Sequence, residues 1–483
     1  MHSDIEVTGG IVRGETEGGL TAFRGIPYAS LPVRFGVPHP VVAWRGVRDA
    51  TRFGPPPPQS GTFGMDALDG ESDGDGDGWL TANVWSSDVG GRLPVMVWIQ
   101  GGAYTFGMSG LPEYDGSTLA RDGVVVVTFN YRVGLEGFGH VEGMAVNRGL
   151  LDQVAALEWV RDHIYLFGGD PERITVFGQS AGGGSVAALL AMPRAAGLFH
   201  RAIAQSAQGT YFTPRLAADI ARACAAELGV EPAELPTVDP WLLPTASDAV
   251  AATIGQFASR WGRAAHAPAL FAPVVDGDVL PTTPWRGLTG SVELLVGHTR
   301  HEQRLLTALG GLLGEITEAQ ANEAAEVFGP DPQRYRESFP DPEERYEVVR
   351  SDWLFRMPSL HLAEAQLEAG GRAHLYELTW PAPGMGGVLG ACHGLDVPLV
   401  FGNLITGQTA MLIGDPTPEA EAMSAQLRGA WTSFATHGDP GWPAYDTGAT
   451  RLFDREPEVT AYPEQVSQQI WREAPGVLDL SGI

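Results

Sequence analysis

The segment RITVFGQSAGGGSV at residues 173–186 constrains the fold of this chain more than any other. A short apolar stretch leads into Gly178-x-Ser180-x-Gly182, and a run of small, helix-compatible residues follows. This order is typical of a strand, a sharp turn and a helix that hold a serine with its hydroxyl exposed. Glycines flank the serine because a Cβ there would clash with a neighbouring strand or helix. The pattern predicts Ser180 as a nucleophile; the alternative is a glycine-rich turn whose serine caps the next helix.

The chain is strongly acidic and lacks lysine. Its 31 basic residues are all arginine and stand against 58 acidic ones, which gives a formal charge of −27. Such a surface would repel nucleic acid and anionic membranes, so neither is expected as a partner. The absence of lysine excludes a Schiff-base lysine, a P-loop lysine and a Ser-x-x-Lys nucleophile. It also suggests a GC-rich, bacterial coding genome.

The lack of a recognisable targeting signal and the small number of cysteines lead us to expect a cytoplasmic protein. No run of about 18 apolar residues is present, so no transmembrane helix is expected. The first residues have neither a basic nor an apolar signal region. Cys224 and Cys392 stand far apart and form no disulfide framework. Cys392 neighbours His393, which would suit a catalytic thiol, but a small buried hydrophobe is the favoured interpretation.

Strand and helix patterns alternate along the chain. Apolar runs predict strands at residues 95–99, 124–129, 174–177, 294–296 and 374–380. Helical spacing from residue 150 to 164 stops at the glycines and proline of residues 168–171. The alternation predicts an α/β fold with a mostly parallel central sheet and helices on both faces. Residues 1–483 are expected to form one domain, with a helix-rich insertion around residues 304–370 that caps the site.

No metal or cofactor is expected. Asp73, Asp75 and Asp77 mimic the first half of an EF-hand loop, but Val84 stands where calcium needs a bidentate glutamate. A solvated surface loop is therefore the favoured interpretation. The segment from His298 to residue 302 lacks the spacing of a zinc-protease helix.

Three further segments complete a candidate site. The strand at residues 95–99 leads into Gly101, Gly102 and Ala103, whose small side chains let backbone N–H groups turn toward an oxyanion. Glu302 follows a predicted strand, and His393 lies between small residues. The order serine, acid, histidine is the nucleophile–acid–base order of α/β-hydrolases.

Several motifs occur together in the order of one family. The chain resembles the type-B carboxylesterases, the group that includes cholinesterases and bacterial p-nitrobenzyl esterases. The matching segments are FRGIPYA at 23–29, NYRVG at 130–134, LLDQ at 150–153, FGGDP at 167–171, FGQSAGG at 177–183, VDGD at 275–278, GHTRHE at 297–302, HG at 393–394 and GDP at 438–440. The resemblance implies the α/β-hydrolase fold and a serine carboxylesterase that acts on a small-molecule ester through an acyl-enzyme, with no cofactor.

The resemblance also carries residue roles. It implies Ser180 as nucleophile, Glu302 as acid and His393 as general base. The oxyanion donors would be the backbone N–H groups of Gly102, Ala103 and Ala181. Rival or supporting residues are Asp396 and Asp276 as alternative acids and Ser206 as a possible supporting hydroxyl. Asp396 ranks below Glu302 because the family has a further acid there outside the triad.

The chain departs from the family at informative positions. Gln100 stands where histidine or tyrosine is usual, which leaves open how the oxyanion loop is supported. Gln179 replaces a glutamate beside the nucleophile and so favours neutral over cationic esters. The family's first disulfide would fall on Pro57 and Trp79 and cannot form. Two alternatives stay open: a same-mechanism hydrolase of a specialised ester, amide or carbamate, and a non-catalytic binding protein on this fold. The sequence does not determine the oligomeric state.

Overall fold

The computed structural model describes residues 1–60 and 78–472. Asp73, Asp75 and Asp77, the acidic residues of the EF-hand-like pattern, lie outside this described part of the chain.

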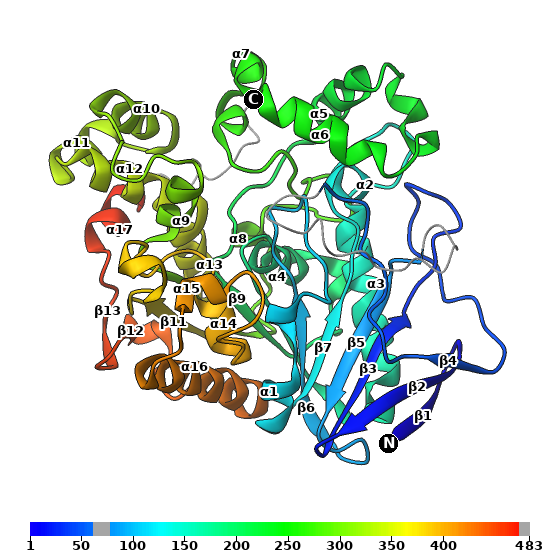
Figure 1. Cartoon of the computed structure of the whole chain (residues 1–483). Coiled ribbons are helices and arrows are strands. Elements are labelled where there is room, and N and C mark those ends of the chain that lie inside the picture. The colour runs from blue at the N-terminus through cyan, green and yellow to red at the C-terminus, as the bar shows by residue number, and fades with distance from the viewer. Residues whose placement is uncertain (61–77, 473–483) are drawn as a thin grey trace.

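Within the described residues, thirteen strands form one twisted sheet (Figure 1). The path order is β1-β2-β3-β5-β7-β6-β8-β9-β10-β11-β12-β13, and β4 pairs with β2. The strands of the first half are β1 (His2–Val7), β2 (Gly10–Glu17), β3 (Leu20–Pro27), β4 (Val47–Asp49), β5 (Thr81–Ser86), β6 (Leu93–Ile99) and β7 (Val125–Phe129). The second half contains β8 (Gly169–Gln179), β9 (Arg201–Gln205), β10 (Glu293–Thr299), β11 (Ala373–Leu378), β12 (Ala449–Phe453) and β13 (Glu458–Ala461).

The sheet is parallel through its middle and antiparallel at both ends. Every pair from β7 across to β12 is parallel. Along the path, β1, β2, β3 and β5 at one edge and β13 at the other pair antiparallel, while the short β4 joins β2 in parallel. The mostly parallel sheet is therefore confirmed, and all five predicted strands are present. The antiparallel edge strands have no long apolar run from which the sequence would predict them.

Both faces of the central strands are buried, as the uninterrupted apolar runs predict. In β7, Val125 and Val127 enter one hydrophobic core while Val126 enters the other. Strand β6 alternates in the same way, with Val97 on the first side and Trp98 on the second. This two-residue alternation follows from the pleat of a strand. Two helical layers therefore cover the sheet, as expected.

The helices of the first core include α3 (Arg148–His163), α4 (Ala181–Ala191) and α13 (Met357–Glu368), and those of the second include α14 (Asp396–Phe401) and α16 (Pro418–His437). Helices outside residues 304–370 that remain are α1 (Ser117–Arg121), α2 (Gly134–Phe138), α5 (Pro214–Glu227), α6 (Leu242–Ala252), α7 (Ala258–Trp261), α8 (Pro284–Gly287), α15 (Ala410–Ile413) and α17 (Gln465–Trp471). None of the helices in the described part combines the length and hydropathy needed to span a bilayer.

Residues 304–370 are mainly helical. The elements are α9 (Glu302–Leu309), α10 (Glu318–Phe328), α11 (Pro332–Ser338), α12 (Pro342–Ser351), the π-helical turn η8 (Asp352–Arg356) and α13. Figure 1 shows α10–α12, together with α5–α7, grouped at one end of the sheet. Thr317 and Asp341 begin α10 and α12 with side-chain caps that accept backbone N–H groups, which explains where these helices start.

Candidate active site

Ser180 lies on a tight turn between β8 and α4. Its φ of 61° and ψ of −124° place it in a strained region for a residue with a side chain. A Cβ on Gly182 would lie 2.0 Å from the carbonyl oxygen of Ile99 in neighbouring β6, and one on Gly178 would lie 2.7 Å from Gly182. The predicted strand–turn–helix geometry and its need for glycine are therefore confirmed.

The loop after β6 packs directly against this turn. A Cβ added to Gly101 would lie only 3.2 Å from the Cβ of Ser180. Gly102 has a φ of 110°, and Ala103 has a φ of 54°. Among the described residues, the N–H groups of Gly102 and Ala103 donate to no protein acceptor, and Ala181 begins α4, where the N–H has no intrahelical partner. Three unpaired donors thus belong to the two segments that meet at Ser180.

Gln100 precedes this loop and is fully buried. Its backbone carbonyl accepts a 2.7 Å hydrogen bond from the Tyr131 hydroxyl. Its carboxamide has no hydrogen-bond partner among the described groups. The loop is therefore fixed at Gln100 through the main chain rather than through the side chain that replaces histidine or tyrosine.

His393 and Glu302 meet at the end of the sheet. Nδ1 of His393 lies 2.5 Å from Oε2 of Glu302, which is fully buried. The other carboxylate oxygen accepts hydrogen bonds from Ser206 Oγ at 2.6 Å and from the Thr299 N–H at 2.8 Å. Burial acts to raise the pKa of Glu302, but the electrostatic interaction with the His393 ring and the hydrogen bonds from His393, Ser206 and Thr299 outweigh it and lower that pKa below its usual range. Glu302 is therefore an anion at neutral pH.

Two side chains hold the imidazole of His393. Phe355 of η8 stacks on it, with ring centroids 4.1 Å apart and an interplanar angle of 28°. Gln179 brings its Nε2 to 3.1 Å from Nε2 of the imidazole. Because Gln179 directly precedes Ser180, this contact places the imidazole next to the turn that bears Ser180. The described hydrogen bonds of His393 go to Glu302 and Gln179, and none goes to Ser180. Neither contact follows from a sequence motif.

The rival acids have other partners. Asp396 is fully buried, and its Oδ2 accepts hydrogen bonds from Gln205 at 2.8 Å and from Tyr376 at 3.2 Å. Burial raises the pKa of Asp396 to about 6. Asp276 accepts backbone N–H groups of residues 278 and 280 in a turn. Neither carboxylate bonds His393.

The two cysteines are buried and unpaired. Burial raises the pKa of the Cys392 thiol to about 12, so it carries its proton at neutral pH and is no thiolate. The interpretation of Cys392 as a small buried hydrophobe is consistent with this environment.

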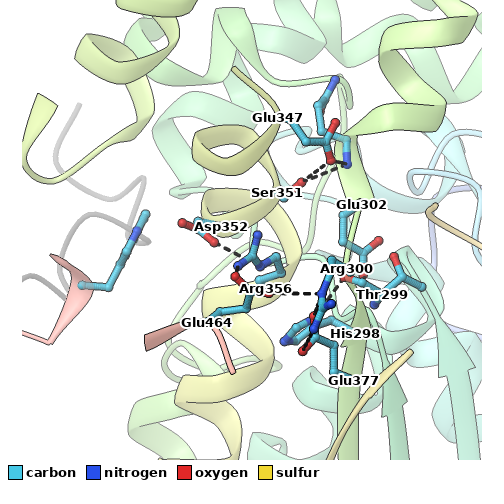
Figure 2. A network of polar contacts seen from close by, with 12 residues as sticks. His298, Thr299, Arg300, Glu302, Glu347, Ser351, Asp352, Arg356, Glu377 and Glu464 are labelled. Carbon is cyan, nitrogen blue, oxygen red and sulfur yellow. Dashed lines mark hydrogen bonds and ion pairs between the residues drawn. The ribbon is translucent and has the colours of Figure 1, made fainter. Parts of the chain in front are cut away.

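A buried ionic network lies behind Glu302 (Figure 2). Arg356 of η8 pairs with Asp352 at 3.2 Å and with Glu464, which precedes α17. Arg300, two residues before Glu302, pairs with Glu377 at 2.9 Å and with Glu464 at 3.4 Å. The network therefore connects Glu464, just before α17, to the short link between β10 and α9, next to Glu302, and to the π-helical turn that bears Phe355.

A second polar cluster in Figure 2 lies on α12. Glu347 Oε1 accepts from Ser351 Oγ at 3.0 Å and from the Gln303 N–H at 3.1 Å. Burial raises the pKa of Glu347 to about 7. In the part of the chain that the structure describes, no group of three or more His, Cys, Asp or Glu side chains could hold a metal ion.

Comparison with known proteins assigns the chain to a family. The model of the carboxylesterase family matches residues 2–471. The para-nitrobenzyl esterase of Bacillus subtilis is 35% identical over 97% of this chain and 98% of its own, and the phenmedipham hydrolase of Pseudarthrobacter oxydans is 34% identical over 95% and 97%.

Solved structures of carboxylesterases also match this chain over nearly its whole length. A thermophilic para-nitrobenzyl esterase superposes with a TM-score of 0.85 at 34% identity, covering 97% of this chain and 100% of its own. A carboxylesterase of Geobacillus stearothermophilus gives a TM-score of 0.84 at 32% identity, covering 97% and 99%. The chain therefore belongs to the carboxylesterase family and is a serine ester hydrolase with the α/β-hydrolase fold.

Proposed function

We propose that Ser180, His393 and Glu302 are the nucleophile, the general base and the acid of this esterase. The 2.5 Å contact between His393 Nδ1 and the buried Glu302 carboxylate is the observation that carries the proposal. A carboxylate there keeps the ring proton on Nδ1 and leaves a lone pair on Nε2. A basic Nε2 next to the segment that bears Ser180 is the arrangement that acyl transfer needs.

The reaction proceeds in two steps. His393 Nε2 accepts the hydroxyl proton while Ser180 Oγ attacks the ester carbonyl, and the imidazolium then protonates the departing alcohol. Water, deprotonated by the same nitrogen, hydrolyses the acyl-enzyme. Glu302 stabilises the imidazolium, and its hydrogen bonds from Ser206 and Thr299 hold the carboxylate in place.

Gly102, Ala103 and Ala181 donate to the oxyanion in this proposal. Their N–H groups have no described protein acceptor and belong to segments packed against Ser180. Preformed donors of this kind need no reorganisation when charge develops. Losing one would raise the barrier by about 3 kcal/mol.

Small neutral esters are the proposed substrates. The side chain next to the nucleophile is the uncharged Gln179, and the nearby Glu302 carboxylate is already bonded to His393. A positively charged group on the substrate would therefore have no free carboxylate to pair with among these residues. Relatives of similar identity are named para-nitrobenzyl esterase, phenmedipham hydrolase and fumonisin B1 esterase, so family membership alone does not select the ester.

We also propose that the helical region around residues 304–370 covers the site within a single domain, residues 1–483. The stacking of Phe355, from this region, on His393 supports that role. A bacterial, cytoplasmic origin is supported by the absence of lysine and by two buried, unpaired cysteines.

Hydrolysis of p-nitrophenyl esters from acetate to decanoate tests the assignment. Wild type is expected to hydrolyse at least the short esters, with a chain-length profile that reports the size of the acyl pocket. Ser180→Ala is expected to lose activity by at least 10³-fold. Ser185→Ala is the matched control, because Ser185 is a buried serine of α4, the helix that follows Ser180, and its hydroxyl accepts a hydrogen bond from Gln153. Full activity in Ser180→Ala, or equal losses in the two variants, would remove Ser180 from the mechanism.

A further inference from the structure

Arg350 of α12 carries a positive charge without an anionic partner. Its guanidinium lies over the ring of Phe328, 5.0 Å from the centroid, and over the ring of Tyr346, at 5.2 Å. The side chain is half-buried, and its buried Nε has no hydrogen-bond partner. Among the residues that the structure describes, the guanidinium forms no hydrogen bond and no ion pair. Because a buried charge is costly unless it is paired, this arginine lacks the partner that its position calls for.

Other arginines of the same helical region are paired. Arg345, on the same helix, binds Glu318 at 2.6 Å and donates to two nearby backbone carbonyls. Arg356 pairs with Asp352 and Glu464. The chain has 58 acidic residues against 31 basic ones, so an unpaired arginine does not follow from a shortage of carboxylates.

The carboxylates near Arg350 have other contacts. Glu347, on the same helix, accepts hydrogen bonds from a serine hydroxyl and a backbone N–H. Glu323 of α10 is largely exposed, and its Oε1 lies 4.0 Å from Nδ1 of His266. Burial lowers the pKa of Arg350, and the neighbouring phenol and carboxylate on α12 oppose that effect only in part. The positive charge therefore remains open to a further anion.

A cavity of about 210 Å³ adjoins Arg350. Residues of η7 (Gly262–His266), α10 and α12 line it, and α10 and α12 pack side by side (Figure 1). Its apolar wall consists of Ala324, Val327 and Phe328, and Gln320 adds an amide. An engineered cavity of about 150 Å³ accepts benzene, so this cavity has room for a ring that bears a carboxylate. None of the lining residues is among the proposed catalytic or oxyanion groups.

The chemistry of these walls indicates the class of ligand. A guanidinium offers parallel N–H donors that match the two oxygens of a carboxylate. One cation beside an apolar wall suits an anion with a single charge and an apolar body, because apolar side chains give no donors to the further oxygens of a phosphate.

We propose that this cavity binds a small monocarboxylate with an apolar body, whose oxygens pair with Arg350 and whose body lies against α10. The site is distinct from the esterase centre, since a separate set of residues forms it. The inference is therefore independent of the roles proposed for Ser180, His393 and Glu302.

Titration with 4-fluorobenzoate, followed by ¹⁹F NMR, tests the proposal without turnover. Wild type should bind this probe, and Arg350→Gln should weaken binding by about 10–100-fold, because charge-assisted hydrogen bonds are lost. Arg350→Lys keeps the charge but not the fork, so it should weaken binding by less. Arg336→Gln is the matched control, because it removes the same charge from an exposed ion pair with Glu326 in the same helical region, and it should bind as wild type does. No binding to wild type, or equal dissociation constants in wild type and Arg350→Gln, would overturn the proposal.

Two further ligands test wild-type protein and do not depend on the folding of a variant. 4-Fluorobenzyl alcohol has the same ring without the charge and should bind at least about 10-fold more weakly. Inorganic phosphate should not displace 4-fluorobenzoate at equal concentration. Equal binding of the alcohol would mean that the charge plays no part, and displacement by phosphate would mean that the apolar body plays none. Either result refutes the proposed ligand.

Discussion

Arg356 stabilises a buried group of carboxylates, and Arg356→Met measures by how much. Its side chain is 2% exposed and pairs with Asp352 and Glu464. Burial acts to raise the pKa of Glu464, yet Arg356 first and Arg300 second lower it from 4.5 to about 2. The lowered pKa means that these arginine charges stabilise the Glu464 carboxylate in the folded protein. Because this carboxyl pKa is lowered, the stabilisation is present above the unfolded-state pKa and is lost as pH falls toward 2.

We expect Arg356→Met to lower the free energy of unfolding by about 3 kcal/mol at pH ~8, within the range of about 3–5 kcal/mol for breaking a buried pair. The loss should shrink at pH ~5.5, where Asp352 and Glu377 are mostly protonated. Burial raises the pKa of Asp352 to about 6 and that of Glu377 to about 7, and the folded variant gains stability as these charges disappear.

Urea unfolding followed by tryptophan fluorescence and far-UV circular dichroism gives the free energy where the two transitions coincide. Arg336→Met is the matched control, because Arg336 pairs with Glu326 at 2.8 Å while both side chains are more than one third exposed. That surface pair should contribute no more than about 1 kcal/mol. Equal losses in the two variants, or a loss in Arg356→Met that does not change with pH, would refute the reasoning.

Four other variants test the site. Ser206→Ala removes a charge-assisted hydrogen bond to Glu302 worth about 1.5–3 kcal/mol, and kcat for p-nitrophenyl acetate should fall by about 10–100-fold while KM stays within about two-fold. Asp396→Asn should raise the midpoint of urea unfolding more at pH ~8 than at pH ~5. A buried carboxyl whose pKa is raised destabilises the fold above that pKa, and the substitution removes this destabilisation. A larger increase at pH ~5 would contradict this reasoning. Glu302→Gln should lose activity that Asp396→Asn keeps, and the reverse would identify Asp396 as the acid. Gly102→Ala would place a Cβ 2.1 Å from the Phe106 carbonyl oxygen, at a backbone φ of 110°. The oxyanion loop should therefore shift, and kcat should drop by about 10²–10³-fold. Gly429→Ala is the control, because a Cβ there meets nothing within 4 Å.

The sequence predicts those features that are fixed by neighbours along the chain. The turn at Ser180 is predictable because the glycines that it needs, Gly178 and Gly182, stand two positions before and after the serine. Strands β6 and β7 are predictable because burial on both faces demands an unbroken apolar run. The antiparallel edge strands are not, since β1 alternates exposed and partly buried residues and has no apolar run. Strand β1 is held by hydrogen bonds to β2, and the strand propensity of single residues does not predict such a pairing partner.

Long-range contacts complete the site, and only the tertiary structure decided them. The sequence left Glu302, Asp396 and Asp276 as rival carboxylates, and the packing alone brings Glu302 to His393. Gln179 meets His393 across 214 positions, and Ser206 meets Glu302 across 96. No spacing rule links such residues, because their approach depends on how strands and helices pack.

For this protein, the sequence by itself determined the strand–turn–helix that holds Ser180 and the small-residue loop that follows β6. Each is a requirement of local backbone geometry and can be read from consecutive residues. The tertiary structure decided which carboxylate binds His393, that Phe355 stacks on the imidazole, and that the Gln179 amide contacts the same ring. Those contacts arise where distant segments converge at one end of the sheet, and convergence is a property of packing rather than of any single segment.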